Sequence, residues 1–262
     1  MPKPFKTPTQ QITHLQTNKL IHFNDLKLSK KLLIDNNYYN VISCGKVRFA
    51  TGVNDNFHTY DESNFNDWIA YFELDRKISN HLMQNILKLE LVINSRTAHY
   101  VAELMETAKL TEFENEAIMQ IIKARKEVAG INFKNYNGFE TWTFITKMMF
   151  NDMKKLVFWL LENKYDYFLK IVDGYTFLQT DDHYMIRRRL NEIHNLRNSL
   201  FHFTPLNIYL VYGKEIKGRL RNDEKIKVAV WLYRLGGNQK GMVDLKAIIG
   251  HTKRFIRIKN KK

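Results

Sequence analysis

Cysteine, proline and glycine are scarce in this sequence of 262 residues. The single cysteine, Cys44, excludes an internal disulfide and any zinc site built from several cysteines. Its apolar neighbours, with no histidine close by in the sequence, favour a buried free thiol over a catalytic nucleophile. Only 4 prolines and 11 glycines interrupt the chain, fewer than a protein of many strands and tight turns needs. Composition therefore predicts a mainly α fold.

Long apolar segments are also missing. No stretch approaches the roughly 18 apolar residues of a membrane-spanning helix. The best runs, residues 156–161 and 228–232, are short and have charged neighbours. The N-terminal residues lack the apolar segment of a secretory signal. We therefore expect a cytoplasmic protein that does not enter a membrane.

Negative charge is in deficit. The chain carries 41 Lys and Arg against 27 Asp and Glu, a formal net charge of +14. Such an excess repels itself unless an anionic partner is bound. Nucleic acid is the first candidate partner and a membrane surface is the second. The 44% of hydrophobic residues is enough for a sizeable core, so we do not expect disorder over most of the chain.

Helix-start residues and apolar spacing divide the chain into elements. Thr7-Pro8 and Asp25 predict the N-caps of two N-terminal helices, and Thr111 with Glu114 predicts a capping box for a helix ending near Val128. Acidic residues at 181–182 favour another helix start. Residues 38–42 fit a short strand or an extended loop, and residues 208–212 fit a strand or a helix. Further helices are expected over 63–105, 141–163, 181–204, 223–235 and 245–258, with a loop over 130–138.

The predicted helix 181–204 carries the candidate chemistry near its end. On a helical wheel its apolar positions fall on one side: Ile193, Leu196, Leu200 and Phe203. His194, Asn198 and His202 follow each other at four-residue steps on the other side, with Arg197 on the flank. The ordinary polar face of an amphipathic helix explains this pattern. Metal-free RNA cleavage also fits, because it needs a group of near-neutral pKa and a fixed cation, as His202 and Arg197 provide.

Helix geometry complicates such a site. Residues five apart, such as Arg197 and His202, are about 140° apart on a regular helix and do not share a face. Either the long arginine reaches round or the helix bends. A symmetry-related chain would supply a second copy of the same residues. We therefore expect a homodimer with a shared cleft.

Four segments of the sequence carry a resemblance to a known family. They are residues 3–42 with Pro4-Phe5-Lys6-Thr7 and Asn37-Tyr38-Tyr39, the helix segment 72–77, the segment 142–150, and Leu196-Arg197-Asn198-Ser199-Leu200-Phe201-His202. Together they resemble the Abi-like proteins of the AbiD/AbiF group, which are phage abortive-infection proteins. The last segment fits the R-x4-6-H motif of the HEPN superfamily, including the polar residue after Arg. Asn151 stands where many members have Gly, a departure that concerns packing more than chemistry.

The resemblance extends over roughly residues 3–235 and implies both a fold and an activity. The implied fold is a single domain, 1–262, with an N-terminal helical hairpin region at 1–50, a HEPN-like helical bundle at 63–204 and a basic C-terminal extension at 205–262. A small β element beside the helices is the open alternative to a wholly helical chain. The implied activity is that of a metal-independent endoribonuclease without a cofactor, often a toxin in a toxin–antitoxin pair. A small noncoding RNA is a possible regulator of such proteins.

Within this interpretation each motif residue has a role. His202 moves protons at the ribose 2′-hydroxyl or the leaving oxygen, Arg197 stabilises charge on the phosphate, and Asn198 orients phosphate or histidine. His194 is an accessory candidate, with a solvated or hydrogen-bonded histidine as the alternative. For RNA binding we expect Arg187 and Arg188, together with Lys253, Arg254 and Arg257 of the basic tail. The alternative is that the tail, which also contains Phe255, is only a solvated end of the chain.

Structural roles explain the other polar candidates in the sequence. Arg96 to His99 is too closely spaced for the HEPN pattern, so we expect a structural role, although it could line the cleft. Asp181, Asp182 and His183 could bind a metal, but capping of the helix start is favoured. The acids Glu73, Asp75 and Glu90 are expected to pair with bases, or one of them to orient Arg197.

Three functions therefore compete. The first is an abortive-infection endoribonuclease acting on RNA. The second is a non-catalytic protein that holds a structured noncoding RNA. The third is a membrane-associated defence factor that uses its basic helices. The first two predict salt-sensitive RNA binding, and only the first predicts cleavage that is lost with His202.

Overall fold

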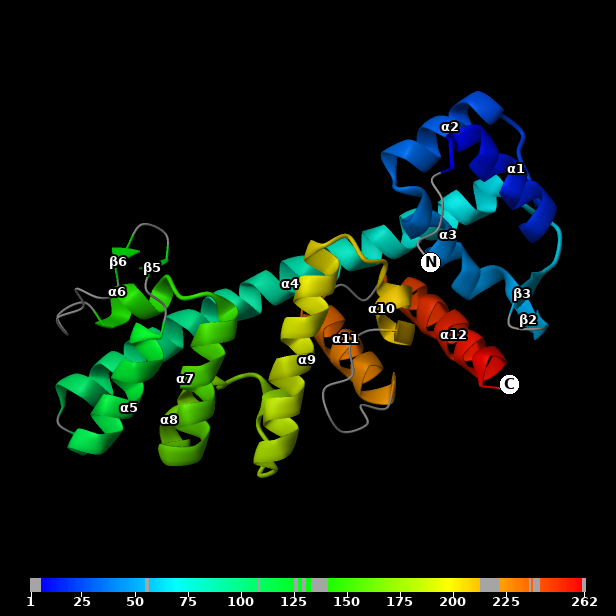
Figure 1. The fold of residues 1–262 in the computed structure, drawn as a ribbon. Helices are drawn as coiled ribbons and strands as arrows, with labels where there is room; N and C mark the ends of the chain where they lie inside the picture. Colours follow the sequence, from blue (N-terminus) through cyan, green and yellow to red (C-terminus); the bar gives the residue numbers. More distant parts are fainter. Residues whose placement is uncertain are drawn as a thin grey trace. The chain divides into compact units, whose positions relative to one another are not determined.

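The computed structural model is mainly helical, as the composition predicts (Figure 1). The chain divides into two compact units, the first formed by Met1–Met83 with Asn195–Lys262 and the second by Gln84–His194. Two helices, α4 (Phe65–Glu106) and α9 (His183–Phe201), contribute residues to both units. The structure describes residues 6–54, 57–107, 109–124, 127–128, 131–132, 141–212, 222–235, 237 and 241–260.

The first unit begins with the predicted helical hairpin. Its helices are α1 (Pro8–Lys19) and α2 (Leu26–Asp35). Thr7 and Gln10 form a reciprocal capping box at the start of α1, and the Asp25 carboxylate accepts from the Leu28 N–H at 2.9 Å. Both predicted N-caps are confirmed. Three short strand pairs complete the β structure of the described chain: β1 (Ile21–His22) with β4 (Ser63–Asn64), β2 (Ala50–Asn54) with β3 (Phe57–Tyr60), and β5 (Glu127–Val128) with β6 (Ile131–Asn132).

Residues 38–42 are neither strand nor loop, because they begin the helix α3 (Tyr38–Phe49). Its apolar side is fully buried at Val41, Cys44 and Val47, one turn apart. Gly45 lies against the Trp68 ring of α4, so close that a Cβ atom there would come within 2.1 Å of it. The prediction was wrong because β-branched and aromatic residues favour strands locally, whereas burial against α4 selects the helix. The buried thiol of Cys44 is confirmed, and burial raises its pKa.

The first unit ends with three helices: α10 (Leu206–Tyr212), α11 (Asn222–Leu235) and α12 (Met242–Lys259). Residues 208–212 are therefore helical. Helix α12 packs on α10, α3 and β2 (Figure 1). Phe255 of this helix is fully buried. The predicted helices 223–235 and 245–258 are both confirmed.

The second unit contains the predicted apolar core helix and its neighbours. Segment 141–163 forms two helices, α6 (Thr141–Thr146) and α7 (Phe150–Asn163), in place of one. Leu156, Leu160 and Leu161 of α7 are fully buried. The capping box of Thr111 and Glu114 is confirmed, but α5 (Glu112–Lys123) ends before Val128, which lies in β5. Helix α8 (Tyr165–Ile171) and the 3-10 helix η2 (Thr176–Leu178) lead to α9.

The long helical pattern after residue 63 is one helix, α4, of 42 residues. It supplies Trp68 and Phe72 to the first unit and Leu89 and Ile93 to the second, all of them buried. Part of the predicted loop 130–138 is the strand β6, and the remainder of that prediction lies outside the described residues. So do residues 3–5 of segment 3–42.

Candidate functional site

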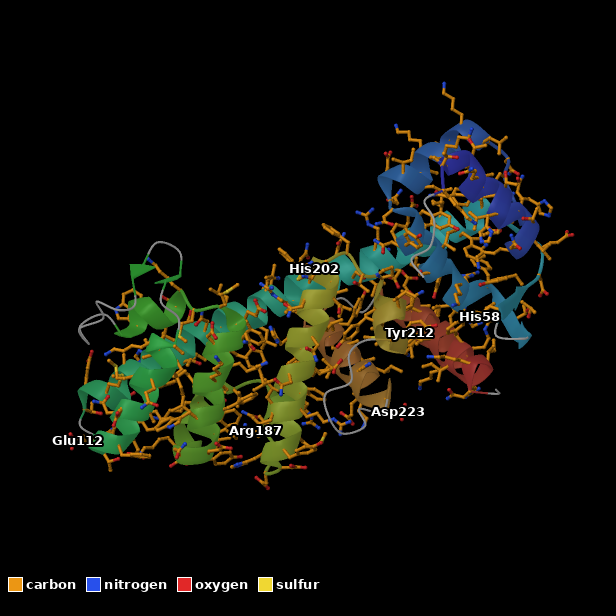
Figure 2. All side chains as sticks on the ribbon, in the orientation of Figure 1. His58, Glu112, Arg187, His202, Tyr212 and Asp223 are labelled. Carbon is orange, nitrogen blue, oxygen red and sulfur yellow. The ribbon has the colours of Figure 1, made fainter. Side chains whose placement is uncertain are left out.

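The motif Arg197 to His202 lies at the C-terminal end of α9 (Figure 2). Leu196 and Leu200 are buried on the core side, as the helical wheel predicts. Arg197 and Asn198 are half-buried, and His202 is exposed. Phe203 departs from the prediction, since 76% of it is exposed and it does not belong to the core side. The polar residues of the motif are therefore accessible at one helix end.

Helix α9 ends at Phe201, three residues earlier than predicted. The Phe203 N–H donates to the Leu200 carbonyl at 3.0 Å and the Thr204 N–H to the Ser199 carbonyl at 2.9 Å, the pattern of a Schellman motif. This pattern requires a left-handed residue, and Phe203 has φ of 57°. The reversal uses residues 202–204 and leads into Pro205. His202 is consequently the cap residue of α9 and not part of a regular turn.

Arg197 is held by its own helix. Its Nη1 donates to the Asn198 Oδ1 at 3.2 Å, and its guanidinium lies 5.3 Å from the centroid of the Phe201 ring. A cation over an aromatic face and a charged hydrogen bond both restrict the side chain. The sequence predicted that Asn198 orients phosphate or histidine, and the contact observed is with the arginine. Arg197 is thus positioned by residues of its own motif, Asn198 and Phe201.

The accessory candidate His194 belongs to the second unit. Its Nδ1 lies 3.4 Å from the Lys154 Nζ, and its ring packs at 5.9 Å on Phe150. Lys154 is 7% exposed, and burial, with a smaller contribution from Lys155, lowers its pKa to about 8. Buried lysines with lowered pKa are frequent in functional sites. Lys154 could not be predicted from the sequence, because the pair Lys154-Lys155 looks like a solvated helix face.

The sequence matches the family described as Abi-like protein over residues 31–206. The chain belongs to the Abi-like protein family. This confirms the family resemblance and places the chain among proteins of abortive infection, a defence against phage. Neither the curated proteins nor the solved structures gave a match. The matched region ends at the start of α10, so that α1, α11 and α12 lie outside it.

The predicted RNA-binding residues of this Abi-like protein have different surroundings. Arg187 pairs with Glu162 and lies 4.8 Å from the Phe158 ring centroid, and Arg188 is half-buried. Three other candidates are exposed on α12: Lys253, Arg254 and Arg257. Arg254 also donates to the carbonyl of Arg48. Phe255, expected to assist the tail, is fully buried and cannot stack on a base.

Two other polar candidates have structural roles in this Abi-like protein. Arg96 donates to the carbonyls of Ile171 and Asp173, at 3.0 and 2.6 Å. The Asp182 carboxylate accepts from the Met185 N–H at 3.1 Å, which confirms the capping interpretation. Within the described part of the chain, no three His, Cys, Asp or Glu side chains gather as a metal site would require. No helix among the described residues is long and apolar enough to span a membrane.

Asp75 differs from its prediction. It neither pairs with a base nor orients Arg197. Its carboxylate accepts from the backbone N–H groups of Leu206, at 2.7 Å, and Asn207, at 3.0 Å. It is fully buried, and burial raises its pKa to about 6 although both N–H groups favour the charged form. Asp75 therefore fixes the start of α10, directly after the motif. Glu73 of the same helix is exposed.

Proposed function

We propose that this Abi-like protein is a metal-independent endoribonuclease of the HEPN type that acts at the end of α9. The observation that carries the proposal is that one short motif holds a positioned guanidinium and an accessible imidazole. Arg197 is held by Asn198 and Phe201, and His202 is exposed five residues further on. Imidazole moves protons near neutral pH, and a fixed cation stabilises developing phosphate charge.

The proposed reaction is an internal transfer at one phosphate of RNA. The ribose 2′-oxygen forms a bond to phosphorus while the bond from phosphorus to the 5′-oxygen breaks. His202 takes the 2′-hydroxyl proton or supplies a proton to the leaving oxygen, and Arg197 stabilises the charged intermediate. The products have 2′,3′-cyclic phosphate and 5′-hydroxyl ends. A homodimer would supply a second His202, so that one imidazole accepts a proton while the other donates one.

The second candidate is a non-catalytic protein that holds a structured noncoding RNA. It is favoured by the net charge of +14 and by the exposed cations Lys253 and Arg257 on α12. Such an RNA could equally restrain an active nuclease. In both cases the binding depends on phosphate contacts and weakens with salt.

Cleavage of total RNA in EDTA tests the first candidate. We expect the wild type to cut RNA and to leave cyclic phosphate ends. His202→Ala and Arg197→Ala should each lower the rate by about 10² or more, since positioned acid–base and charge-stabilising groups contribute that much. His22→Ala is the matched control, because His22 is also exposed in the first unit, where it pairs with Glu62 at 3.6 Å.

Two outcomes contradict the nuclease proposal. Cleavage that persists in His202→Ala would show that another group performs the proton transfer. If neither the wild type nor the variants cut RNA, yet all co-purify with one discrete RNA, the second candidate is favoured. The double variant Arg197→Ala/His202→Ala separates the two properties, because we expect it to bind RNA without cutting it.

A further inference from the structure

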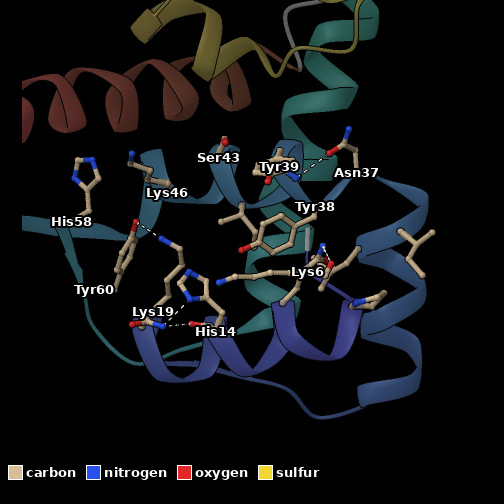
Figure 3. A pocket seen from close by; sticks show the side chains of 16 residues that line it. Lys6, His14, Lys19, Asn37, Tyr38, Tyr39, Ser43, Lys46, His58 and Tyr60 are labelled. Atoms are coloured by element: carbon tan, nitrogen blue, oxygen red, sulfur yellow. Dashed lines mark hydrogen bonds between the residues drawn. The ribbon is translucent and has the colours of Figure 1, made fainter. Parts of the chain in front are cut away.

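A large cavity opens in the first unit (Figure 3), and none of its described lining residues belongs to the motif. Its volume is about 1340 Å³, and α1, α2, α3 and β3 contribute its walls. Pockets that bind small ligands usually have volumes of roughly 300–1,000 Å³. The space is therefore sufficient for a nucleotide, or for more than one. The cavity is lined partly by α1, which lies outside the family match.

The polar lining of the cavity is basic. Lys6, Lys19 and Lys46 line it together with His14 and His58, and no Asp or Glu occurs among its described lining residues. Figure 3 shows Lys6 extending toward His14 and Tyr38. Lys19 Nζ donates to the Tyr60 hydroxyl at 2.9 Å, which fixes this ammonium group at the wall. The lining offers charged donors to an anion and no carboxylate to repel it.

Aromatic side chains lie beside these cations. Tyr38 and Tyr39 meet edge to face, with ring centroids 5.3 Å apart, and Tyr39 is 60% exposed. Burial raises the pKa of both Tyr38 and Tyr60, which keeps their hydroxyls protonated as donors. Aromatic faces stack on nucleic-acid bases without regard to sequence. The cavity thus combines the two chemistries that a nucleotide requires, phosphate binding and base stacking.

The cavity is also joined to the basic helix α12. Lys46 Nζ lies 5.7 Å from the centroid of the Phe255 ring, and the His58 ring lies 5.1 Å from it. Arg254, next to Phe255, donates to the Arg48 carbonyl of α3. The buried Phe255 therefore fixes α12 against two lining residues, with Lys253 and Arg257 exposed on the same helix.

We propose that this cavity binds a nucleotide, with its phosphate on Lys6, Lys19 and His14 and its base against Tyr38 and Tyr39. The same chemistry is present in a free nucleotide and in one unit of a single-stranded RNA. The proposal does not depend on cleavage at His202, so binding is measured in the full-length chain with His202→Ala, where the RNA probe is not consumed.

The decisive comparison uses two double variants with equal loss of charge. Lys6→Gln/Lys19→Gln removes two cations from the cavity. Lys27→Gln/Lys31→Gln removes two exposed cations from α2 that do not line it. The probes are a labelled six-nucleotide RNA, followed by fluorescence anisotropy, and AMP, followed by calorimetry. We expect the cavity variant to bind at least about tenfold more weakly, and the control variant to change less than about twofold.

Tyr39 provides an independent test, because an exposed side chain can be replaced without loss of the fold. Tyr39→Ala should weaken binding by about tenfold and Tyr39→Phe should not, since the stacking face is retained. Circular dichroism establishes that each variant is folded. If the wild-type cavity binds AMP and the cavity variant does not, the ligand is a free nucleotide. If the cavity variant weakens the binding of RNA and AMP does not bind, the ligand is an RNA strand. Equal losses in both double variants, or no loss with Tyr39→Ala, would overturn the proposal.

Discussion

Asp75 is a single residue on which the motif depends indirectly. Its buried carboxylate receives the first N–H groups of α10, the helix that follows Pro205 and the end of α9. A third donor, the Ser79 hydroxyl, lies at 3.3 Å. These hydrogen bonds offset part of the free energy lost when a charge is buried, and burial still dominates, so the pKa rises from 3.8 to about 6.

The raised pKa gives a testable dependence of stability on pH. Between pH 3.8 and 6 folded Asp75 holds a proton that the unfolded chain releases, so its contribution to stability is present at low pH and declines as pH rises. From pH 5 to pH 7 this group alone lowers the free energy of unfolding by about 1 kcal/mol. The difference between wild type and Asp75→Asn, measured by urea unfolding, should therefore be larger at pH 5 than at pH 7.

The control for this measurement is Asp67→Asn, which removes an exposed carboxylate from the same helix. The difference in the free energy of unfolding between Asp67→Asn and the wild type should change less between pH 5 and pH 7 than the difference for Asp75→Asn. If the Asp75→Asn difference is the same at both, the raised pKa is not present in the folded protein.

At the scale of one element, α3 depends on a close contact with α4. The Trp68 ring is fully buried and stacks on Phe49 at 5.0 Å, so it cannot move away from Gly45. The glycine is required by this approach of helix and ring, and not by its backbone conformation. Local residue preferences in 38–42 predicted a strand or loop, because they contain no information about the ring that lies opposite.

Two glycine variants test this account of α3. Gly45→Ala should lower the free energy of unfolding by about 3 kcal/mol, because the new methyl group overlaps the ring. Gly250→Ala, in the exposed middle of α12, meets no atom within 4 Å and should raise stability by roughly 0.5–1 kcal/mol through helix propensity. Urea unfolding measures both. A Gly45→Ala chain as stable as the wild type would contradict the tight packing of α3 on Trp68.

At the scale of the whole molecule, the excess of positive charge is the property that most affects binding. The net charge of +14 attracts any polyanion, whatever its sequence, and each cation that contacts a phosphate displaces a counterion. Affinity for RNA should accordingly fall with salt. The slope of the logarithm of affinity against the logarithm of salt concentration counts the phosphate contacts.

That slope tests the part played by α12. For single-stranded RNA the slope is negative, and each lost phosphate contact reduces its magnitude by about 0.7. Lys253→Gln/Arg257→Gln should therefore make the slope less steep by about 1.4. The measurement is anisotropy at several salt concentrations in the His202→Ala background. Lys27→Gln/Lys31→Gln again serves as the charge-matched control. A wild-type slope in the α12 variant would mean that these exposed cations do not contact the phosphates.

The sequence by itself determined the features that depend on near neighbours. The mainly α class follows from the scarcity of proline and glycine, the caps at Thr7, Asp25 and Thr111 from their residue types, and the long helix after residue 63 from apolar spacings of three and four residues. The segments that carried the family resemblance could be recognised for the same reason, since each is a short local pattern. The motif at Arg197 to His202 was found in this way, and its role remains a prediction.

Only the tertiary structure decided what depends on residues distant in the chain. The helical state of α3 required Trp68, the role of Asp75 required the start of α10, and the burial of Phe255 required α3 and the strand β3. The cavity likewise gathers Lys6, Lys46 and Tyr60 from separate elements. Burial and hydrogen bonding across such separations reverse local preferences, because the free energy of packing a side chain exceeds the differences in propensity that a sequence expresses.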